Sequence, residues 1–188
     1  MIELTKGQEL ALVDDEGLPL GRLHMGVGWD HERTAGFIGT GAPEIDLDAS
    51  AVLFGDGQLF DLAFYNNLQT RDGSVVHEGD NTSGRGEGDD EMLTVDLGKV
   101  HQRIDTIVFL VSSYQGHTLE WVHNAYCRLV DDRDVEVARF TLSLGVPQTG
   151  LAMAKIFRDG EQWKLRAIGE GIAVKVPSES VNELRPYI

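Results

Sequence analysis

The stretch that determines the fold class is Ile104-Asp105-Thr106-Ile107-Val108-Phe109-Leu110-Val111. It is rich in β-branched residues, and its second half is almost wholly apolar, which is typical of a central strand covered on both faces. Short runs of similar character precede and follow it along the chain. These strand-like runs occupy residues 8–13, 22–27, 47–54, 121–130, 135–142, 152–157 and 162–168.

Turn signals separate these runs at short intervals. Asp-Gly pairs occur at positions 56–57, 72–73 and 159–160, and both residues tolerate positive φ, so the last pair predicts a hairpin. Helical signals are few: residues 59–65 and 97–103 suit a turn or short helix, and Ser180 with Glu183 has the spacing of a capping box. We therefore expect one all-β domain, residues 1–188, built as a β-sandwich of two mainly antiparallel sheets with a few short helices.

The composition excludes several function classes. Lys and Arg number 16 against 31 Asp and Glu, a formal net charge of −15, so neither nucleic acid nor an anionic lipid surface is an expected direct partner. The single cysteine, Cys127, rules out an internal disulfide framework and a Cys-rich zinc site. The N-terminus lacks a signal-peptide pattern and no apolar run suits a membrane span, so we expect a cytoplasmic protein without a transmembrane segment.

The negative charge is concentrated in one third of the chain. Residues 30–91 contain 14 acidic side chains and only three arginines, a formal charge of −11. The acids are mixed with Gly, Asn and aliphatic residues, a mixture that indicates folded loops around a site. A solvated acidic face is the simpler alternative.

Three segments within this region offer oxygen ligands. In an extended strand Asp46 and Asp48 point to the same face and repel each other unless a cation lies near them. Asn66 and Asn67 add neutral oxygens, and residues 79–91 combine carboxylates with alternating glycines. Calcium takes six to eight such ligands in tolerant geometry, so it is the favoured ion; magnesium, manganese or a merely acidic loop remain alternatives.

Catalytic and phosphate-binding patterns are weaker. The glycines at 84, 86 and 88 run into Asp89-Asp90-Glu91, which would repel a phosphate, and the spacing fails the EF-hand pattern. No serine sits in a nucleophile elbow and no distinct general base accompanies the acids. We expect a protein that is not an enzyme. A metal-dependent hydrolase using the same acids, or a scaffold that contacts a basic partner, is the alternative.

The acidic segments also carry a family resemblance. Gly28-Trp29-Asp30, Asp46-Leu47-Asp48-Ala49-Ser50, Tyr65-Asn66-Asn67 and the run from Gly79-Asp80-Asn81 to Asp89-Asp90-Glu91 follow the order found in the TerD family of tellurite-resistance proteins. Leu4-Thr5-Lys6-Gly7 and Ala125-Tyr126-Cys127-Arg128 resemble that family too, so the match covers nearly the whole chain.

The resemblance implies a cytoplasmic stress-response protein that binds two calcium ions and acts as a calcium-dependent binding or scaffold module. It also implies a protein partner, such as a TerC-type membrane protein or other stress-complex proteins, through which the chain would lie peripherally at the inner membrane. The family's ligand positions correspond to Asp30, Asp46, Asp48, Asn66, Asn67, Asp80, Glu87, Asp89, Asp90 and Glu91. Glu87 stands where the family more often has Asp, so we expect altered geometry at one of the two sites.

Overall fold

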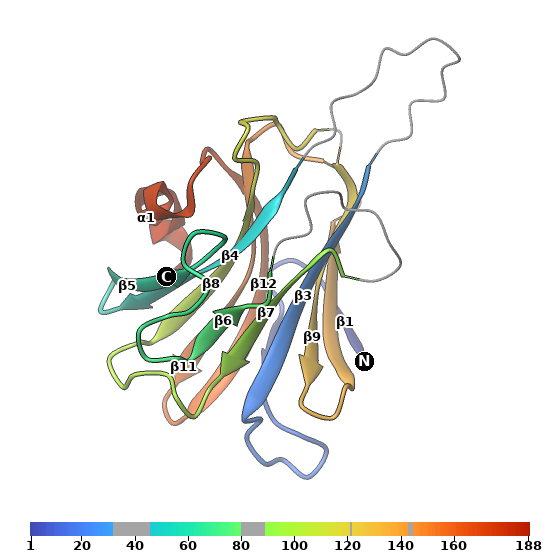
Figure 1. Ribbon diagram of the computed structural model, residues 1–188. Coiled ribbons are helices and arrows are strands. Elements are labelled where there is room, and N and C mark those ends of the chain that lie inside the picture. Colours follow the sequence, from blue (N-terminus) through green and yellow to red (C-terminus); the bar gives the residue numbers. More distant parts are fainter. Residues whose placement is uncertain (32–45, 80–88, 121, 143–144) are drawn as a thin grey trace.

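The computed structural model describes residues 1–31, 46–79, 89–120, 122–142 and 145–188 (Figure 1). Strands dominate this part of the chain, and the short helices lie at the C-terminus. The strands are β1 (Ile2–Leu4), β2 (Glu9–Ala11), β3 (Arg22–His31), β4 (Asp48–Gly55), β5 (Gln58–Ala63), β6 (Val75–His77), β7 (Glu91–Asp96), β8 (Thr106–Ser112), β9 (Val122–Asp131), β10 (Glu136–Leu142), β11 (Gly150–Asp159) and β12 (Gln162–Ile172). The helices are η1 (Pro177–Glu179), α1 (Val181–Leu184) and η2 (Arg185–Tyr187).

The strands form two sheets that pack face to face. The first sheet has the order β1-β10-β9-β3-β7-β6 and the second the order β2-β12-β11-β8-β4-β5. Neighbouring strands are antiparallel except for β1, which pairs with β10 in parallel. The predicted fold class, a β-sandwich of mainly antiparallel sheets, is confirmed.

Strand β8 is buried along its whole length, as its apolar sequence predicts. Ile107, Phe109 and Val111 point between the sheets and join the main core. Val108 and Leu110 point to the opposite side, into a second apolar cluster on the outer face of the second sheet. Both faces of this strand are buried, where a polar side chain would lose its hydration, and this explains the continuous apolar run.

The C-terminal helices cover this outer cluster. Leu184 of α1 is fully buried in it, and Figure 1 shows α1 on the outside of the sheet that contains β4 and β8. The predicted capping box is wrong, because the Ser180 hydroxyl donates to the Pro177 carbonyl at 2.6 Å and makes no cap bond. The suggested helix over residues 59–65 is also wrong: β5 pairs with the edge of β4 there, and that tertiary pairing overrides the local signal.

Two predicted turns form. Gly160 and Glu161 connect β11 to β12, with Gly160 at φ +63°. Asp159 is the last residue of β11 and pairs with Gln162, so it lies just outside the two central residues of this hairpin. Asp56 and Gly57 both have positive φ, at 52° and 70°, and connect β4 to β5. Positive φ at both central residues is the requirement that selects Asp-Gly in tight hairpins.

The end of β4 supplies a stability test. A Cβ at Gly55 would overlap the backbone carbonyl of Arg103, whereas a Cβ at Gly21 meets nothing within 4 Å. Because the Arg103 backbone cannot move as a side chain does, we expect Gly55→Ala to lower the free energy of unfolding by about 1–3 kcal/mol. Gly21→Ala is the matched control and should cost far less. Urea denaturation of both variants measures the difference, and equal costs would contradict this packing.

Candidate functional site

Two buried side chains of the first sheet bond to the backbone of the second sheet where β4 and β7 begin. The backbone N–H of Ala49 donates to Glu91 Oε2 at 2.5 Å, and His77 Nε2 lies 3.1 Å from the Ala49 carbonyl oxygen. Strand β5 pairs with β4 only from Ala51 onward, so the backbone of Ala49 faces the first sheet instead. Glu91 and His77 thereby tie the two sheets together.

The contacts of His77 define its tautomer. The backbone N–H of Gly79 donates to Nδ1 at 3.2 Å, so Nδ1 acts as an acceptor and Nε2 carries the ring proton. Nε2 then donates to the Ala49 carbonyl and lies 3.4 Å from Glu91 Oε2. This is the contact pattern of a neutral imidazole, held between backbone groups of Gly79 and Ala49 beside the Glu91 carboxylate.

Asp90 holds the end of β3 against the start of β7. Its Oδ2 accepts the backbone N–H of Trp29 at 2.9 Å, and its own N–H donates to the Val27 carbonyl at 2.8 Å. The Asp90 residue is 9% exposed. Asp30, the next candidate ligand along β3, follows Trp29 directly, and its side chain lies outside the described part of the structure.

Asp89 belongs to a different environment, on the outer face of the first sheet. Arg128 Nε lies 2.8 Å and 3.0 Å from its two carboxylate oxygens, and the Tyr126 hydroxyl donates to it at 3.1 Å. Burial and the Asp89 charge raise the pKa of Tyr126 to about 12. A Cβ at Gly26 would overlap the Asp89 carboxylate, so glycine is what lets Asp89 lie flat on β3. Arg128 therefore compensates the charge of Asp89 directly.

Asp48 lies on the outward side of β4, opposite Ser112 of β8. Asp48 is 5% exposed. The pKa of Tyr65 is raised, mainly by the burial of its own ring and secondly by the negative charge of Asp48. Tyr65 begins the Tyr65-Asn66-Asn67 segment, so the structure brings two of the predicted ligand segments together. Asn67 Nδ2 donates to the Leu62 carbonyl at 2.7 Å, which leaves its amide oxygen as its ligand atom.

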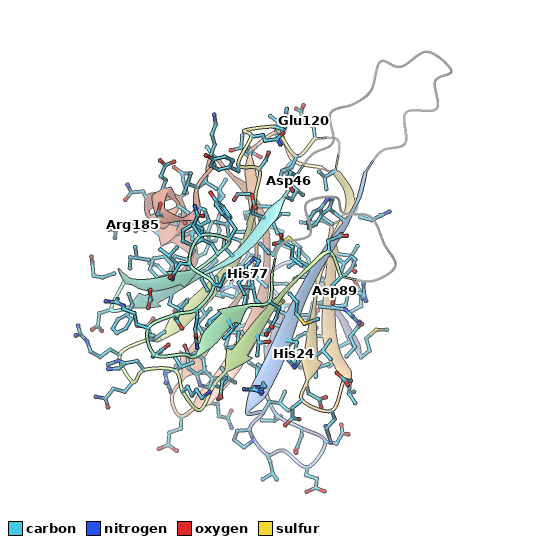
Figure 2. The ribbon with its side chains drawn as sticks, viewed as in Figure 1. His24, Asp46, His77, Asp89, Glu120 and Arg185 are labelled. Atoms are coloured by element: carbon cyan, nitrogen blue, oxygen red, sulfur yellow. The ribbon has the colours of Figure 1, made fainter. Side chains whose placement is uncertain are left out.

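The other candidate ligands are distributed as follows. Asp46 is half-buried just ahead of β4, and Figure 2 shows it apart from Asp89, which precedes β7 beside β3. Asn66 is exposed. Asp80 and Glu87 lie outside the described residues. Within the described ranges no three His, Cys, Asp or Glu side chains lie close enough together to hold a metal ion, so the complete ligand set stays a prediction.

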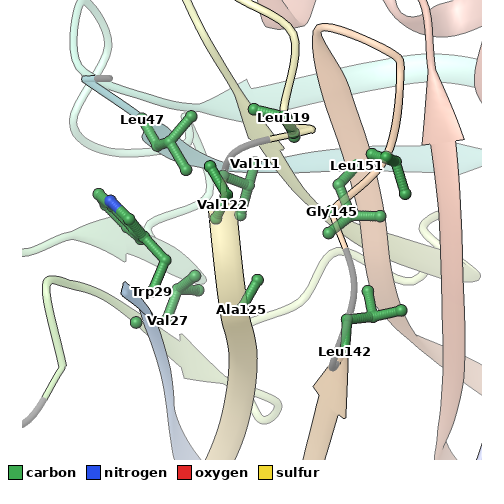
Figure 3. Close-up of a pocket in the computed structure, with 12 residues that line it drawn as sticks. Val27, Trp29, Leu47, Val111, Leu119, Val122, Ala125, Leu142, Gly145 and Leu151 are labelled. Carbon is green, nitrogen blue, oxygen red and sulfur yellow. The ribbon is translucent and has the colours of Figure 1, made fainter. Parts of the chain in front are cut away.

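An apolar pocket lies between the sheets at the same end of the sandwich (Figure 3). Trp29, Leu47 and Val111 are among its lining residues, and its volume of about 10 Å³ has room for one water molecule at most. The Trp29 indole N–H is buried here without a hydrogen-bond partner among the described residues. The pocket is therefore a small packing defect beside Asp90 and not a ligand site.

Sequence reasoning missed the partners that hold the acids. Arg128 and Tyr126 alternate with buried Cys127 and Leu129 on β9, a pattern that indicates an outward-facing pair but not which acid it meets. In the sequence, His77 lies between two of the acidic segments, but this position does not reveal its role. Its bond to Ala49 depends on the packing of one sheet on the other, which periodicity along the chain does not reveal.

A two-sheet sandwich with buried carboxylates at its strand ends defines a class of acidic β-sandwich proteins. The TerD domain model matches residues 1–178, and the chain belongs to the TerD family. The chain is 36% identical to tellurium resistance protein TerZ of Serratia marcescens, over 90% of this chain and 89% of that protein. It is 37% identical to stress response protein SCP2 of Bacillus subtilis, over 90% of this chain and 92% of that protein.

A solved structure has the same fold. It is a homologue of telluride resistance protein (TerD) from Streptomyces coelicolor, with a TM-score of 0.68 and 18% identity, and the match covers 88% of this chain and 98% of that chain. The family predicted from the acidic segments is thus confirmed.

Glu91 provides the test of the link between the sheets. In chelator, we expect Glu91→Ala to lower the free energy of unfolding by about 1–3 kcal/mol, because it leaves the buried N–H of Ala49 without an acceptor. Glu91→Gln keeps an acceptor oxygen at the same place and should cost clearly less. Chemical denaturation of both variants in EGTA measures the two costs. If Glu91→Gln is as damaging as Glu91→Ala, the hydrogen bond to Ala49 is not what stabilises this end.

Proposed function

We propose that this TerD-family chain binds two calcium ions at the acidic end of its sandwich and acts in stress response as a calcium-dependent binding module. The observation that carries the proposal is the burial of three carboxylates, Asp48, Asp90 and Glu91, at strand ends that meet there. They are 5%, 9% and 3% exposed.

Electrostatics supports a cation at this end. Ionised carboxylates lose hydration when they are buried, and neighbouring negative charges add repulsion unless positive charge compensates them. Arg128, the arginine nearest these segments in the described structure, contacts Asp89 and Glu136 on the outer face of the first sheet. A divalent ion would add positive charge at the acidic end itself.

The chemistry of the donors fits calcium. Asp46, Asp48, Asn66 and Asn67 would form one group of oxygen ligands, and Asp90 and Glu91 with Asp30 a second, with Asp80, Glu87 and Asp89 as the remaining candidates. Calcium prefers such hard oxygen donors in flexible geometry. The soft donor is remote: Cys127 is buried in the main core, where burial raises the pKa of its thiol to about 12. This donor set favours calcium over zinc or copper.

The proposed role as a binding module depends on the effect of calcium on the strand ends. Calcium would order the ends of β3, β4 and β7 and present them to a partner, and its removal would leave their carboxylates repelling one another. The relatives named for tellurium resistance and stress response support the cellular setting. The structure has no helix, within the described residues, that is long and apolar enough to cross a membrane. We propose a cytoplasmic location, with membrane association through a partner such as a TerC-type protein.

We do not propose catalysis. A metal-dependent hydrolase needs a general base beside the ion. Among the described side chains, His77 is the histidine that contacts the candidate ligand Glu91. Both of its ring nitrogens already contact backbone groups, of Gly79 and Ala49. A histidine held in this way orients a strand and is poorly placed to accept a proton from water.

Calcium titration with matched variants tests the proposal. The EGTA-stripped protein should bind about two calcium ions by calorimetry, and its stability should rise by about 2.7 kcal/mol for each site at a calcium concentration 100 times the dissociation constant. Asp48→Asn should lose about half of the total rise, because it removes a buried carboxylate from one of the two proposed sites. Asp132→Asn is the control: it removes the same charge from an exposed turn between β9 and β10 and should behave like the wild type.

Thermal melts in calcium, magnesium and chelator provide the readout. A calcium-selective rise in melting temperature that Asp48→Asn reduces and Asp132→Asn preserves supports the site. The proposal is wrong if the wild type melts alike in calcium and in chelator. Equal losses in the two variants would reduce the effect to general charge screening.

A further inference from the structure

A second site of opposite charge lies on the outer face of the second sheet, beside the C-terminal segment. It is a cleft of about 230 Å³ whose lining includes Lys6, Lys155, Arg166, Glu170 and Tyr187. We call it the basic cleft. The basic cleft contains three cationic side chains, although the whole chain has a formal charge of −15. The residues come from the turn before β2, from β11 and β12, and from η2, none of which supplies a candidate calcium ligand.

Strand pairing places two of the cations side by side. Lys155 of β11 is directly opposite Arg166 of β12, and like charges in that position destabilise a sheet. Half-buried Lys155 stacks its ammonium group over the Phe157 ring, 4.8 Å from the centroid. Burial, and secondarily the Arg166 charge, lower the pKa of Lys155. The floor of the basic cleft therefore holds positive charge at an energetic cost.

The carboxylates near the basic cleft compensate this charge only in part. Lys6 pairs with Glu170 at 2.6 Å, and Arg166 reaches Glu9 at 3.8 Å, with both partners of each pair well exposed to solvent. No carboxylate among the described residues forms an ion pair with Lys155. Exposed pairs contribute little, about 0–1 kcal/mol, so an anion that enters the basic cleft can still gain from Lys155 and Arg166.

We propose that the basic cleft binds the phosphate group of a small phosphate monoester. A phosphate dianion would sit against Lys155 and Arg166, whose guanidinium donates in a geometry that suits phosphate oxygens. Tyr187 and Ile188 form the other wall and also pack on the outer apolar cluster, so they offer apolar contact to a short organic group. The volume is below that of pockets for drug-sized ligands, which restricts the ligand to a few atoms beyond the phosphate.

Calorimetric titration with phenyl phosphate and with inorganic phosphate, in calcium-free buffer of low ionic strength, tests this site. The wild type should bind both, and phenyl phosphate more tightly. Lys155→Met and Arg166→Gln should each weaken binding at least about tenfold, since each removes a charge-assisted contact. Lys164→Gln is the matched control: Lys164 lies on the same strand, pairs with Asp159 and does not line the basic cleft.

Melting temperatures of the three variants confirm that each is folded before binding is compared. Absence of binding to either probe by the wild type overturns the proposal. So does a loss in Lys164→Gln that equals the losses in the two cleft variants, because the effect is then one of overall charge. Sedimentation with phosphatidylserine vesicles, without a response to the soluble probes, also overturns it and assigns the surface to lipid headgroups.

Discussion

The structure depends on how the two sheets are joined at their acidic end. Strand β5 pairs with β4 only from Ala51 onward, so the backbone N–H and carbonyl of Ala49 have no neighbouring strand and face the first sheet. The Glu91 carboxylate and the His77 imidazole form the hydrogen bonds that a neighbouring strand would otherwise form. A buried carboxylate is thus part of the fold as a backbone acceptor, so some of the negative charge at this end has a structural role.

The acidic residues near this link lie in two environments, which differ in the groups that contact their carboxylates. Asp89 lies on the outer face against Arg128 and Tyr126, where protein groups neutralise it. Asp48, Asp90 and Glu91 are buried, and Asp90 and Glu91 accept the backbone N–H groups of Trp29 and Ala49. We propose that divalent cations compensate the charge of these buried carboxylates. The basic cleft, on the outer face of the second sheet, gathers three cationic side chains at a site that none of these acids lines.

Much of the fold could be predicted because it follows from local patterns. The apolar run of β8, the alternation in β12 and the Asp-Gly hairpin at 159–160 each specify their own geometry. The edge strand β5 could not be predicted in this way, since its half-buried sequence acquires strand character from pairing with β4. The acidic segments were evident from charge alone. Their partners were not: Arg128 reaches Asp89 across 39 residues, and Lys155 meets Arg166 through a bulged register, which only the folded sheets reveal.

The central claim is that specific divalent ions compensate the buried carboxylates. Native mass spectrometry of the intact protein, exchanged into calcium or into magnesium at matched concentration, tests it most directly because it counts bound ions. The account predicts two retained calcium ions per chain, few or no retained magnesium ions, and fewer calcium ions in Asp48→Asn. Equal retention of calcium by the wild type and Asp48→Asn, or no calcium retained at all, would contradict it.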